Sequence, residues 1–176
     1  MNPNLEAKYL RLEKSRNRLL DNLEQLDPAI LNTPAADNKW SVGQIVAHLV
    51  LVEEFTVCYM QRKLQEPEKL ISSSLSHTVK SILLTILLKS QVRFKAPPRM
   101  ADVPEEVCLP ELRSKWDHLR FQFEDLLTDL PPELLHKCLF KHPYAGPLSA
   151  AQCLTFLQDH FDHHAAQIKQ LIKVKS

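Results

Sequence analysis

Two histidines spaced four residues apart are the first feature of this sequence that suggests chemistry. His160 and His164 lie in a segment typical of a helix, so their side chains project from one face, one turn apart. Both fall on the apolar stripe of that helix, where an imidazole without a partner is costly. A metal ion bound by the pair would satisfy both rings. Two neutral histidines paired with side chains or water are the alternative, and the spacing alone leaves both interpretations open.

A third histidine, His48, occupies a core-facing position between Ile45 and Val52 on another predicted helix. If the two helices face each other, three imidazoles meet and leave open positions around an ion. That pattern is typical of a catalytic metal site, because a closed structural site uses four protein ligands. No cysteine is spaced to join as a thiolate. The four cysteines are expected to be reduced, buried packing groups: Cys58, Cys108, Cys138 and Cys153.

Charged and polar neighbours of these histidines are weaker candidates. His163 points about 100° away from the adjacent histidine on a helix, so we expect it on a neighbouring face. Asp159 and Asp162 are candidates for orienting an imidazole, with a solvated face as the alternative. Glu53 and Glu54 follow the core-facing histidine of their helix by one to two turns. Either is a candidate general base, although ordinary surface charge is the interpretation we favour.

Three residues in predicted loops flank this region. Trp40 is expected to be an apolar anchor near the start of the helix that carries the third histidine. His142 and Tyr144 either border the mouth of a pocket or occupy ordinary loop positions.

Arg16 interrupts the apolar stripe of the first helix, and we expect its stem to lie along the core with its charged head in water.

The composition excludes several classes of protein. The chain has 176 residues, which favours a single domain over residues 1–176, and its net charge of +1 argues against a nucleic-acid partner. Its two glycines exclude glycine-rich phosphate-binding loops and disfavour a turn-rich β fold. The apolar run at 82–88 is far shorter than the ~20 residues of a membrane helix. With no apolar signal segment at the N-terminus, we expect a cytoplasmic protein without a membrane partner.

Four long amphipathic helices are predicted from apolar residues at alternating spacings of three and four. Ser41 and Gln44 form a predicted capping box at the start of the second helix, and Ser149 is expected to cap the last one. Asp27–Pro28 ends the first helix, because proline supplies no N–H and disfavours helix in the residue before it. The four segments span about residues 5–26, 41–66, 110–130 and 149–173.

The region from Glu68 to Pro110 is the least regular part of the sequence. Only residues 76–89 read as a shorter helix within it. A connection of this length is long enough to cross from one end of a bundle to the other, and such connections are usually functional or mobile. The elements together predict an all-α four-helix bundle, with a long crossover between the second and third long helices and a short extra helix.

Three segments resemble signatures of the DinB superfamily, also called DinB/YfiT-like proteins. The second-helix signature is similar to WSVGQIVAHL at 40–49, and the last-helix signature is similar to HFDHHAAQI at 160–168. The approach to the last helix resembles HPYAGPLS at 142–149. The resemblance spans about two thirds of the chain and omits the crossover. It implies an up-down-down-up bundle, often a homodimer, with zinc or nickel held by three histidines: His48, His160 and His164.

The resemblance also limits the chemistry. The family includes thiol-dependent S-transferases, a maleylpyruvate isomerase and proteins described as metal-dependent hydrolases, and the motifs do not choose among them. It implies an enzyme with a small-molecule substrate, in which a divalent ion activates water or a low-molecular-weight thiol cofactor for transfer or hydrolysis. The alternative function is a non-catalytic helical bundle that binds a metal or another ligand.

Overall fold

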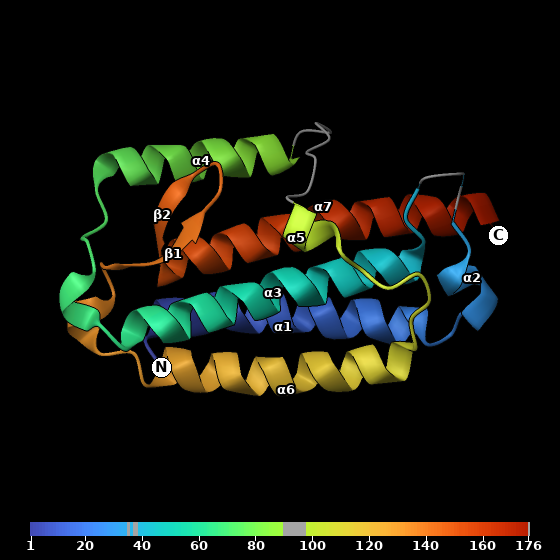
Figure 1. Cartoon of the computed structure of the whole chain (residues 1–176), viewed down its shortest axis with the longest axis horizontal. Coiled ribbons are helices and arrows are strands. Elements are labelled where there is room, and N and C mark those ends of the chain that lie inside the picture. Colours follow the sequence, from blue (N-terminus) through green and yellow to red (C-terminus); the bar gives the residue numbers. More distant parts are fainter. Residues whose placement is uncertain (35, 37–38, 90–97, 176) are drawn as a thin grey trace.

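Four long helices form the body of the molecule. The computed structural model describes residues 1–34, 36, 39–89 and 98–175. The long helices are α1 (Pro3–Leu23), α3 (Val42–Leu64), α6 (Leu109–Thr128) and α7 (Ala150–Lys175). α1 and α7 run in one direction, whereas α3 and α6 run in the other (Figure 1). The chain is therefore a four-helix bundle, as the helix pattern predicts, and its topology is up-down-down-up, as the resemblance implies.

Local signals set the starts of α3 and α7 where the sequence predicts them, whereas α1 ends at Leu23, before the predicted stop at Asp27–Pro28, and Pro28 instead begins a separate short helix. The Ser41 hydroxyl accepts a hydrogen bond from the Gln44 backbone N–H at 3.1 Å, and the Gln44 side chain accepts one from the Ser41 N–H at 3.0 Å. This reciprocal capping box satisfies two backbone donors that α3 leaves unpaired. Ser149 and Gln152 form the same pair at the start of α7. Both helices that carry the candidate histidines thus begin at residues fixed by their own sequence.

The apolar stripes of the four helices meet in one core. α1 packs against α7 and α6, and α3 packs against α6 and α7. The largest fully buried side chains come from all four long helices and the hairpin described below, and they include Leu12, Met60, Trp116, Leu139 and Leu154. Burying one such side chain contributes about 1.5–3 kcal/mol, so the shared core dominates the stability of the bundle.

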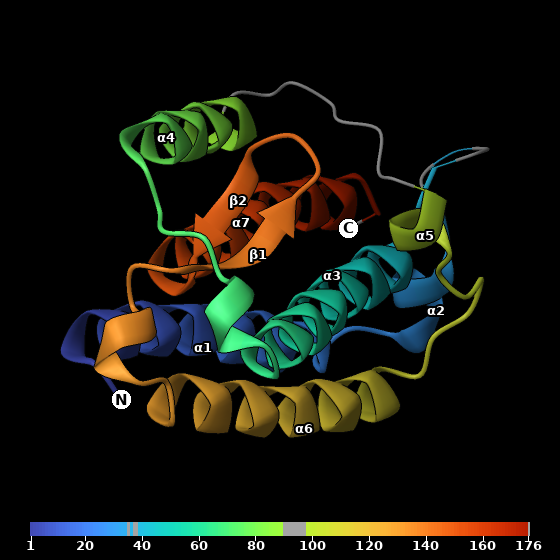
Figure 2. The ribbon, with the colours of Figure 1, turned by 60° about the vertical axis from the view of Figure 1, so that its left-hand side comes forward.

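A long crossover is required because α3 and α6 run in the same direction. It contains the 3₁₀ turn η1 (Pro67–Lys69), α4 (Leu75–Lys89) and the short helix α5 (Pro98–Ala101). α4 packs against α7, and α5 packs against α3 (Figure 2). The helix predicted at 76–89 is therefore present, and the two described helices of the crossover lie on α7 and α3.

The end of the crossover docks on the first turn of α3 at Gly43. A Cβ atom on Gly43 would lie 2.2 Å from the Val107 Cγ2 atom, so only glycine allows this approach. The Asn32 side chain donates to the Val107 carbonyl at 3.1 Å and accepts from the Val107 N–H at 3.0 Å. Asn32 ends α2 (Pro28–Asn32), a short helix that the sequence analysis did not predict.

A β-hairpin occupies a segment that the sequence analysis assigned to a loop. β1 (Cys138–His142) pairs antiparallel with β2 (Gly146–Ser149), after the 3₁₀ turn η2 (Pro132–Leu134). Gly146 has a φ of 76°, which only glycine adopts without strain, and it closes the turn. Leu139, Phe140 and Leu148 are buried beneath the hairpin. Tertiary burial of these side chains stabilises strands that are too short to predict from periodicity.

Arg16 is an expectation that the structure corrects. Its side chain is buried rather than solvated, and its guanidinium lies over the Trp116 ring at 5.8 Å. Glu13 and Asp117 form ion pairs with it. The interruption in the apolar stripe of α1 is therefore a buried arginine that pairs with partly exposed carboxylates of α1 and α6.

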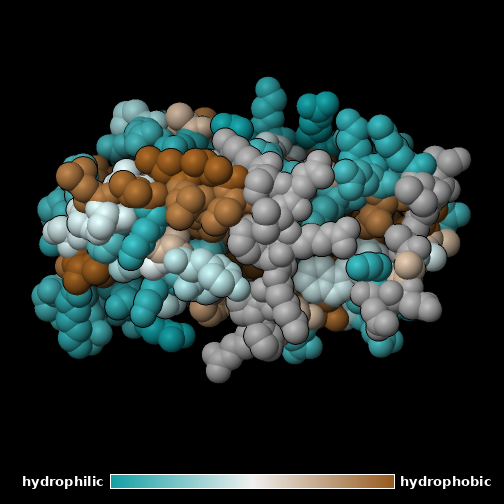
Figure 3. Space-filling view, turned by 90° about the horizontal axis from the view of Figure 1, so that it is seen from above, coloured by the Kyte–Doolittle hydropathy of each residue, from teal (hydrophilic) through white to brown (hydrophobic). Residues whose placement is uncertain are grey.

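Two helices, α3 and α4, are markedly apolar. α3 is long and apolar enough to cross a membrane by length and composition, but 67% of that stretch is buried in the bundle, as in a core helix. α4 carries a row of apolar side chains, each more than half exposed, on the face turned away from α7 (Figure 3). These side chains are Leu75, Val79, Ile82, Leu83 and Ile86.

Candidate metal centre

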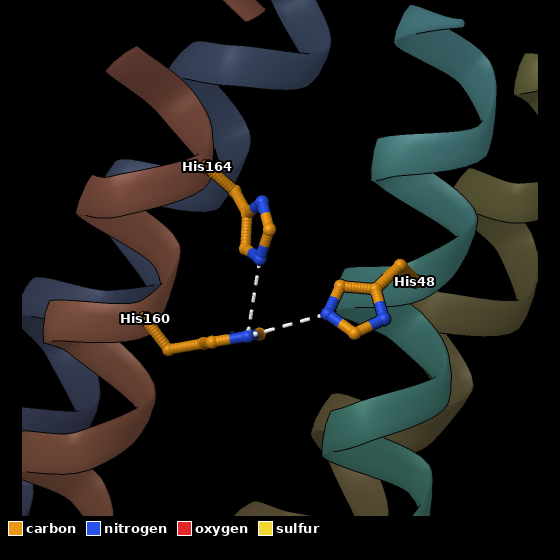
Figure 4. A group of neighbouring side chains, drawn as sticks. All are labelled: His48, His160 and His164. Carbon is orange, nitrogen blue, oxygen red and sulfur yellow. Dashed lines mark hydrogen bonds between the residues drawn. The ribbon is translucent and has the colours of Figure 1, made fainter. Parts of the chain in front are cut away.

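Three histidines from two helices meet between α3 and α7. The Nε2 atom of His160 lies 3.3 Å from His48 Nε2 and 3.2 Å from His164 Nε2 (Figure 4). One nitrogen from each ring lies within 4.8 Å of the other two. Among the described residues, this is the only group of three or more histidine, cysteine or acidic side chains that offers ligand atoms at this separation.

The helical period of each element brings the rings together. His48 is 3% exposed and lies on the core face of α3, and α3 packs directly on α7. His160 and His164 are one turn apart on α7 and face α3 from successive turns. The packing of α3 on α7 places the single histidine of α3 opposite the pair on α7.

Hydrogen bonds on the outer side of the rings fix two of the three tautomers. His48 Nδ1 lies 2.7 Å from the Met100 carbonyl, which only accepts, so Nδ1 carries the hydrogen. His164 Nδ1 lies 2.9 Å from Gln167 Oε1, which is likewise an acceptor. Each ring therefore presents an unprotonated Nε2 to the centre of the cluster. Partners of this kind typically orient metal-binding imidazoles.

Burial keeps these imidazoles neutral. Desolvation lowers the pKa of His48, although the hydrogen bond to Met100 opposes this shift. Desolvation lowers the pKa of His164 to about 3, with a further contribution from the charge of His48. Burial and the neighbouring histidines hold the pKa of His160 well below its usual value. A neutral imidazole is the form that binds a metal, so the rings are prepared for that role at neutral pH.

The donor set fits one divalent cation better than it fits a proton. His160 Nε2 lies between the unprotonated Nε2 atoms of His48 and His164. A hydrogen on His160 Nε2 can be donated to only one of these two nitrogens at a time. The lone pair of the other nitrogen then receives no hydrogen from His160. A cation among the three rings would satisfy all three nitrogens, and imidazole suits zinc and nickel.

Aromatic rings surround the cluster. The Trp40 ring lies 5.0 Å from that of His48, and the Phe156 ring lies 5.6 Å from that of His160, measured between centroids. Trp40 is therefore more than an anchor at the start of α3, because its ring also packs against a candidate ligand. A low-polarity surrounding of this kind strengthens electrostatic interactions inside a site.

His142 and Tyr144, the two loop candidates, take different positions on the hairpin. His142 is buried against Phe156, with ring centroids 4.5 Å apart. Its Nδ1 atom accepts hydrogen bonds from the backbone N–H groups of Tyr144 and Ala145 at 3.2 and 3.1 Å. His142 therefore organises the hairpin turn one ring away from the cluster, whereas the Tyr144 side chain is exposed.

The carboxylates proposed from sequence lie elsewhere. Glu53 is buried against α6, where it contacts Trp116 Nε1 at 3.1 Å and Arg120 Nη2 at 2.9 Å. It is thus neither a surface charge nor positioned by α3 toward the histidines, because it lies about 140° around the helix from His48. Glu54 pairs with Lys115 at the surface.

The acidic residues of α7 also differ from each other. Asp162 is exposed, accepts a hydrogen bond from Gln158 at 2.9 Å and pairs with Arg11 across the face toward α1. Asp159 is buried, so a solvated face is not its environment. His163 lies beside the cluster rather than in it, as expected.

Two contributors to the site were missed at the sequence level. Gln167 has a signal that could have revealed it, since it lies three residues after His164 on the same helix and is able to accept from that ring. Met100 acts through its backbone carbonyl, which has no signature in the side-chain sequence. The cysteines take no part. Cys138 and Cys153 are buried as predicted, but Cys58 and Cys108 are exposed.

The fold and the cluster together define a class of protein, a four-helix bundle of up-down-down-up topology with three histidines converging between its second and last long helices. The chain belongs to the DinB superfamily, whose family model matches residues 11–168. The resemblance of the two helix signatures is thereby confirmed. The matched range runs from α1 to α7 and includes the crossover between α3 and α6.

Individual relatives agree with this assignment. The chain is 29% identical over 160 residues to a Bacillus mycoides (strain KBAB4) protein whose name provisionally assigns it as a metal-dependent hydrolase, covering 91% of this chain and 80% of that protein. The crystal structure of TT2238, a four-helix bundle protein, matches with a TM-score of 0.61 and 22% identity, covering 94% of this chain and 98% of that one.

A second solved structure is YfiT from Bacillus subtilis, described as a probable metal-dependent hydrolase with an unusual four-helix bundle topology. It matches with a TM-score of 0.61 and 18% identity, covering 99% of this chain and 89% of its own. At these identities the two solved structures support the fold of this chain.

Proposed function

We propose that this protein is a metal-dependent hydrolase, in which His48, His160 and His164 bind one divalent ion. The observation that carries the proposal is the convergence of one imidazole nitrogen from each of three rings within 4.8 Å, with two of the rings held in one tautomer by acceptors on their outer side. The names of two similar proteins refer to metal-dependent hydrolysis and support the same chemistry.

A divalent ion held by three neutral ligands retains open positions and supplies Lewis acidity, which makes water a nucleophile near neutral pH. The chain's own residues do the remaining work. The three imidazoles hold the ion, Met100 and Gln167 orient two of them, and Trp40 packs against one ring. We propose zinc or nickel as the ion, because imidazole ligands suit both, and a small molecule as the substrate.

Metal titration tests the ligand assignment. We expect wild-type protein to bind about one zinc or nickel ion per chain at pH 7.5 by calorimetry. His48→Ala, His160→Ala and His164→Ala should each weaken binding by more than the 10- to 100-fold that loss of an orienting partner costs. His118→Ala is the matched control, because His118 is exposed on α6 and bonds to Gln122. Circular dichroism should show a folded bundle in every variant.

A substrate panel tests the reaction class. Metal-loaded wild type should hydrolyse members of a panel of small esters and amides, and His48→Ala should not. Each reaction is repeated with a low-molecular-weight thiol and an electrophilic acceptor. Turnover only with the thiol would replace hydrolysis by thiol transfer. Metal binding without turnover in either panel would favour the non-catalytic bundle, and absence of metal binding would reject the proposed centre.

A further inference from the structure

We propose that the crossover holds the metal centre in its binding form through a hydrogen-bonded relay, in which His163 and Gln167 are positioning residues for His164. This inference rests on the proposed metal site. His163 Nδ1 lies 3.1 Å from the Leu88 carbonyl of α4, and His163 Nε2 lies 2.9 Å from Gln167 Nε2. Gln167 Oε1 lies 2.9 Å from His164 Nδ1, which completes a chain from α4 to a candidate ligand.

The direction of every hydrogen bond in this relay follows from its first member. The Leu88 carbonyl has no hydrogen to donate, so His163 Nδ1 must donate to it. The Gln167 amide nitrogen has only hydrogens to offer, so His163 Nε2 accepts one of them. This orients the Gln167 side chain, and its Oε1 accepts the hydrogen on His164 Nδ1. His164 Nε2 is therefore left unprotonated toward the other two histidines.

The crossover also fixes the histidine on the opposite helix. Met100 belongs to α5, and its carbonyl accepts the hydrogen on His48 Nδ1 at 2.7 Å. Leu88 near the end of α4 and Met100 in α5 thus act on the two walls of the site, one through the relay and one directly. Figure 2 shows α4 over α7 and α5 over the start of α3. The crossover carries no candidate ligand, yet in this relay its carbonyls set which nitrogen holds the hydrogen in two of the three, His48 and His164.

Removal of the relay should leave α4 in place, because other contacts attach this helix to α7. Leu84 and Leu88 are buried on the side of α4 that faces the bundle. The Gln152 side chain of α7 donates to the Thr78 hydroxyl at 3.2 Å. A variant of His163 or Gln167 therefore tests the orientation of His164 separately from the seating of the crossover.

Zinc affinity measured by calorimetry is the first readout. Gln167→Met keeps the length of the side chain and removes both hydrogen bonds, and we expect zinc to bind about 10- to 100-fold more weakly. His163→Phe keeps the ring and should also weaken binding, by a smaller factor. The double variant should match Gln167→Met, because residues in one chain of hydrogen bonds do not contribute independently. Gln167→Glu retains an acceptor for His164 but cannot donate to His163 Nε2, so it should bind zinc more tightly than Gln167→Met.

Asp162→Asn is the matched control for these variants. It changes a neighbouring residue of α7 whose partners are Gln158 and Arg11, on the face toward α1. Its zinc affinity should equal that of the wild type. His163 is not one of the three candidate ligands. We nevertheless expect His163→Ala to weaken zinc binding, as His163→Phe does.

Imidazole ¹⁵N chemical shifts of the metal-free protein are the second readout, and they do not depend on metal binding. In wild type, His163 and His164 should each show the hydrogen on Nδ1. In Gln167→Met, His164 should lose this single tautomer while the amide spectrum of α4 stays unchanged. A wild-type tautomer and wild-type affinity in Gln167→Met would overturn the relay. Absence of zinc binding by wild type would instead overturn the proposed function, and the ¹⁵N shifts would still decide the relay.

Discussion

At the scale of single residues, the tautomer of each histidine decides its role, because it sets which ring nitrogen donates and which accepts. His48 and His164 are held with the hydrogen on Nδ1 by acceptors outside the cluster. His142 is held the opposite way, because its Nδ1 accepts two backbone N–H groups of the hairpin turn. The same side chain therefore serves as a candidate ligand in one place and as a turn acceptor in another, according to its partners.

We expect the hairpin to depend on pH through His142. Burial lowers the pKa of His142 to about 4, whereas the pKa in the unfolded chain is about 6.5. The unfolded chain therefore takes up this proton first, so the free energy of unfolding falls as pH drops from 6.5 toward 4. This residue contributes up to about 1.4 kcal/mol per pH unit and has no effect above that window.

Urea unfolding of metal-free protein between pH 4 and 8 measures this slope. His142→Phe keeps a ring against Phe156 and removes the titrating group. Below pH 6.5, the dependence of the free energy of unfolding on pH should therefore correspond to about one proton fewer taken up on unfolding. Amide hydrogen exchange at Tyr144 and Ala145 should quicken in the same pH range in the wild type. An unchanged slope in His142→Phe would show that this histidine does not carry the effect.

At the scale of elements, α3 performs two tasks on two faces. One face places His48 against α7, and another places Glu53 against α6. Glu53 and Arg120 are both buried, with Glu53 Oε1 lying 2.6 Å from Arg120 Nε. Burial raises the pKa of Glu53, while the Arg120 charge and the Trp116 hydrogen bond oppose that shift. The pair fixes how α3 and α6 sit together and thereby keeps the histidine face turned toward α7.

Breaking this pair should destabilise the bundle strongly. We expect Glu53→Leu to lower the free energy of unfolding by about 3–5 kcal/mol, because Arg120 is left buried without its main partner. The double variant Glu53→Leu/Arg120→Met should recover at least half of that loss, since no buried charge remains unpaired. Chemical denaturation of the four proteins in this cycle gives the coupling energy. A double variant as unstable as the sum of the single variants would contradict the pairing.

At the scale of the whole molecule, the candidate centre lies where three separate parts of the chain meet. α3 and α7 provide the histidines. The crossover provides the Met100 carbonyl, which bonds His48, and the Leu88 carbonyl, which bonds His163 beside the cluster. A metal bound there would connect the second helix, the last helix and the crossover, and it would bind the folded chain far better than the unfolded one. Metal binding should therefore be linked to global stability.

We expect zinc to raise the melting temperature of the wild type. At a free concentration 100-fold above the dissociation constant, binding adds about 2.7 kcal/mol. For a chain of this length that corresponds to a rise of about 5–10 °C. Differential scanning calorimetry at pH 7.5 measures the shift, with His118→Ala expected to match wild type and His48→Ala to show none at the same zinc concentration. A rise of equal size in His48→Ala would place the stabilising ion elsewhere.

The sequence alone determined the long helices and the face on which each candidate ligand lies. The helix period, the capping boxes at Ser41 and Ser149, and the proline positions are local signals, because they depend on residues within a few positions of each other. They were sufficient to predict the long helices, the short helix of the crossover and the placement of three histidines at core positions of two helices.

The tertiary structure decided what those residues meet. Glu53 pairs with Arg120, 67 positions away, and His163 meets the Leu88 carbonyl, 75 positions away. The hairpin exists because its short strands bury apolar side chains against α3 and α7. Backbone carbonyls are the same at every residue, so no side-chain pattern reveals which one will accept a hydrogen from an imidazole. The helices were therefore readable from sequence, whereas the partners that orient the histidines depend on packing between distant segments.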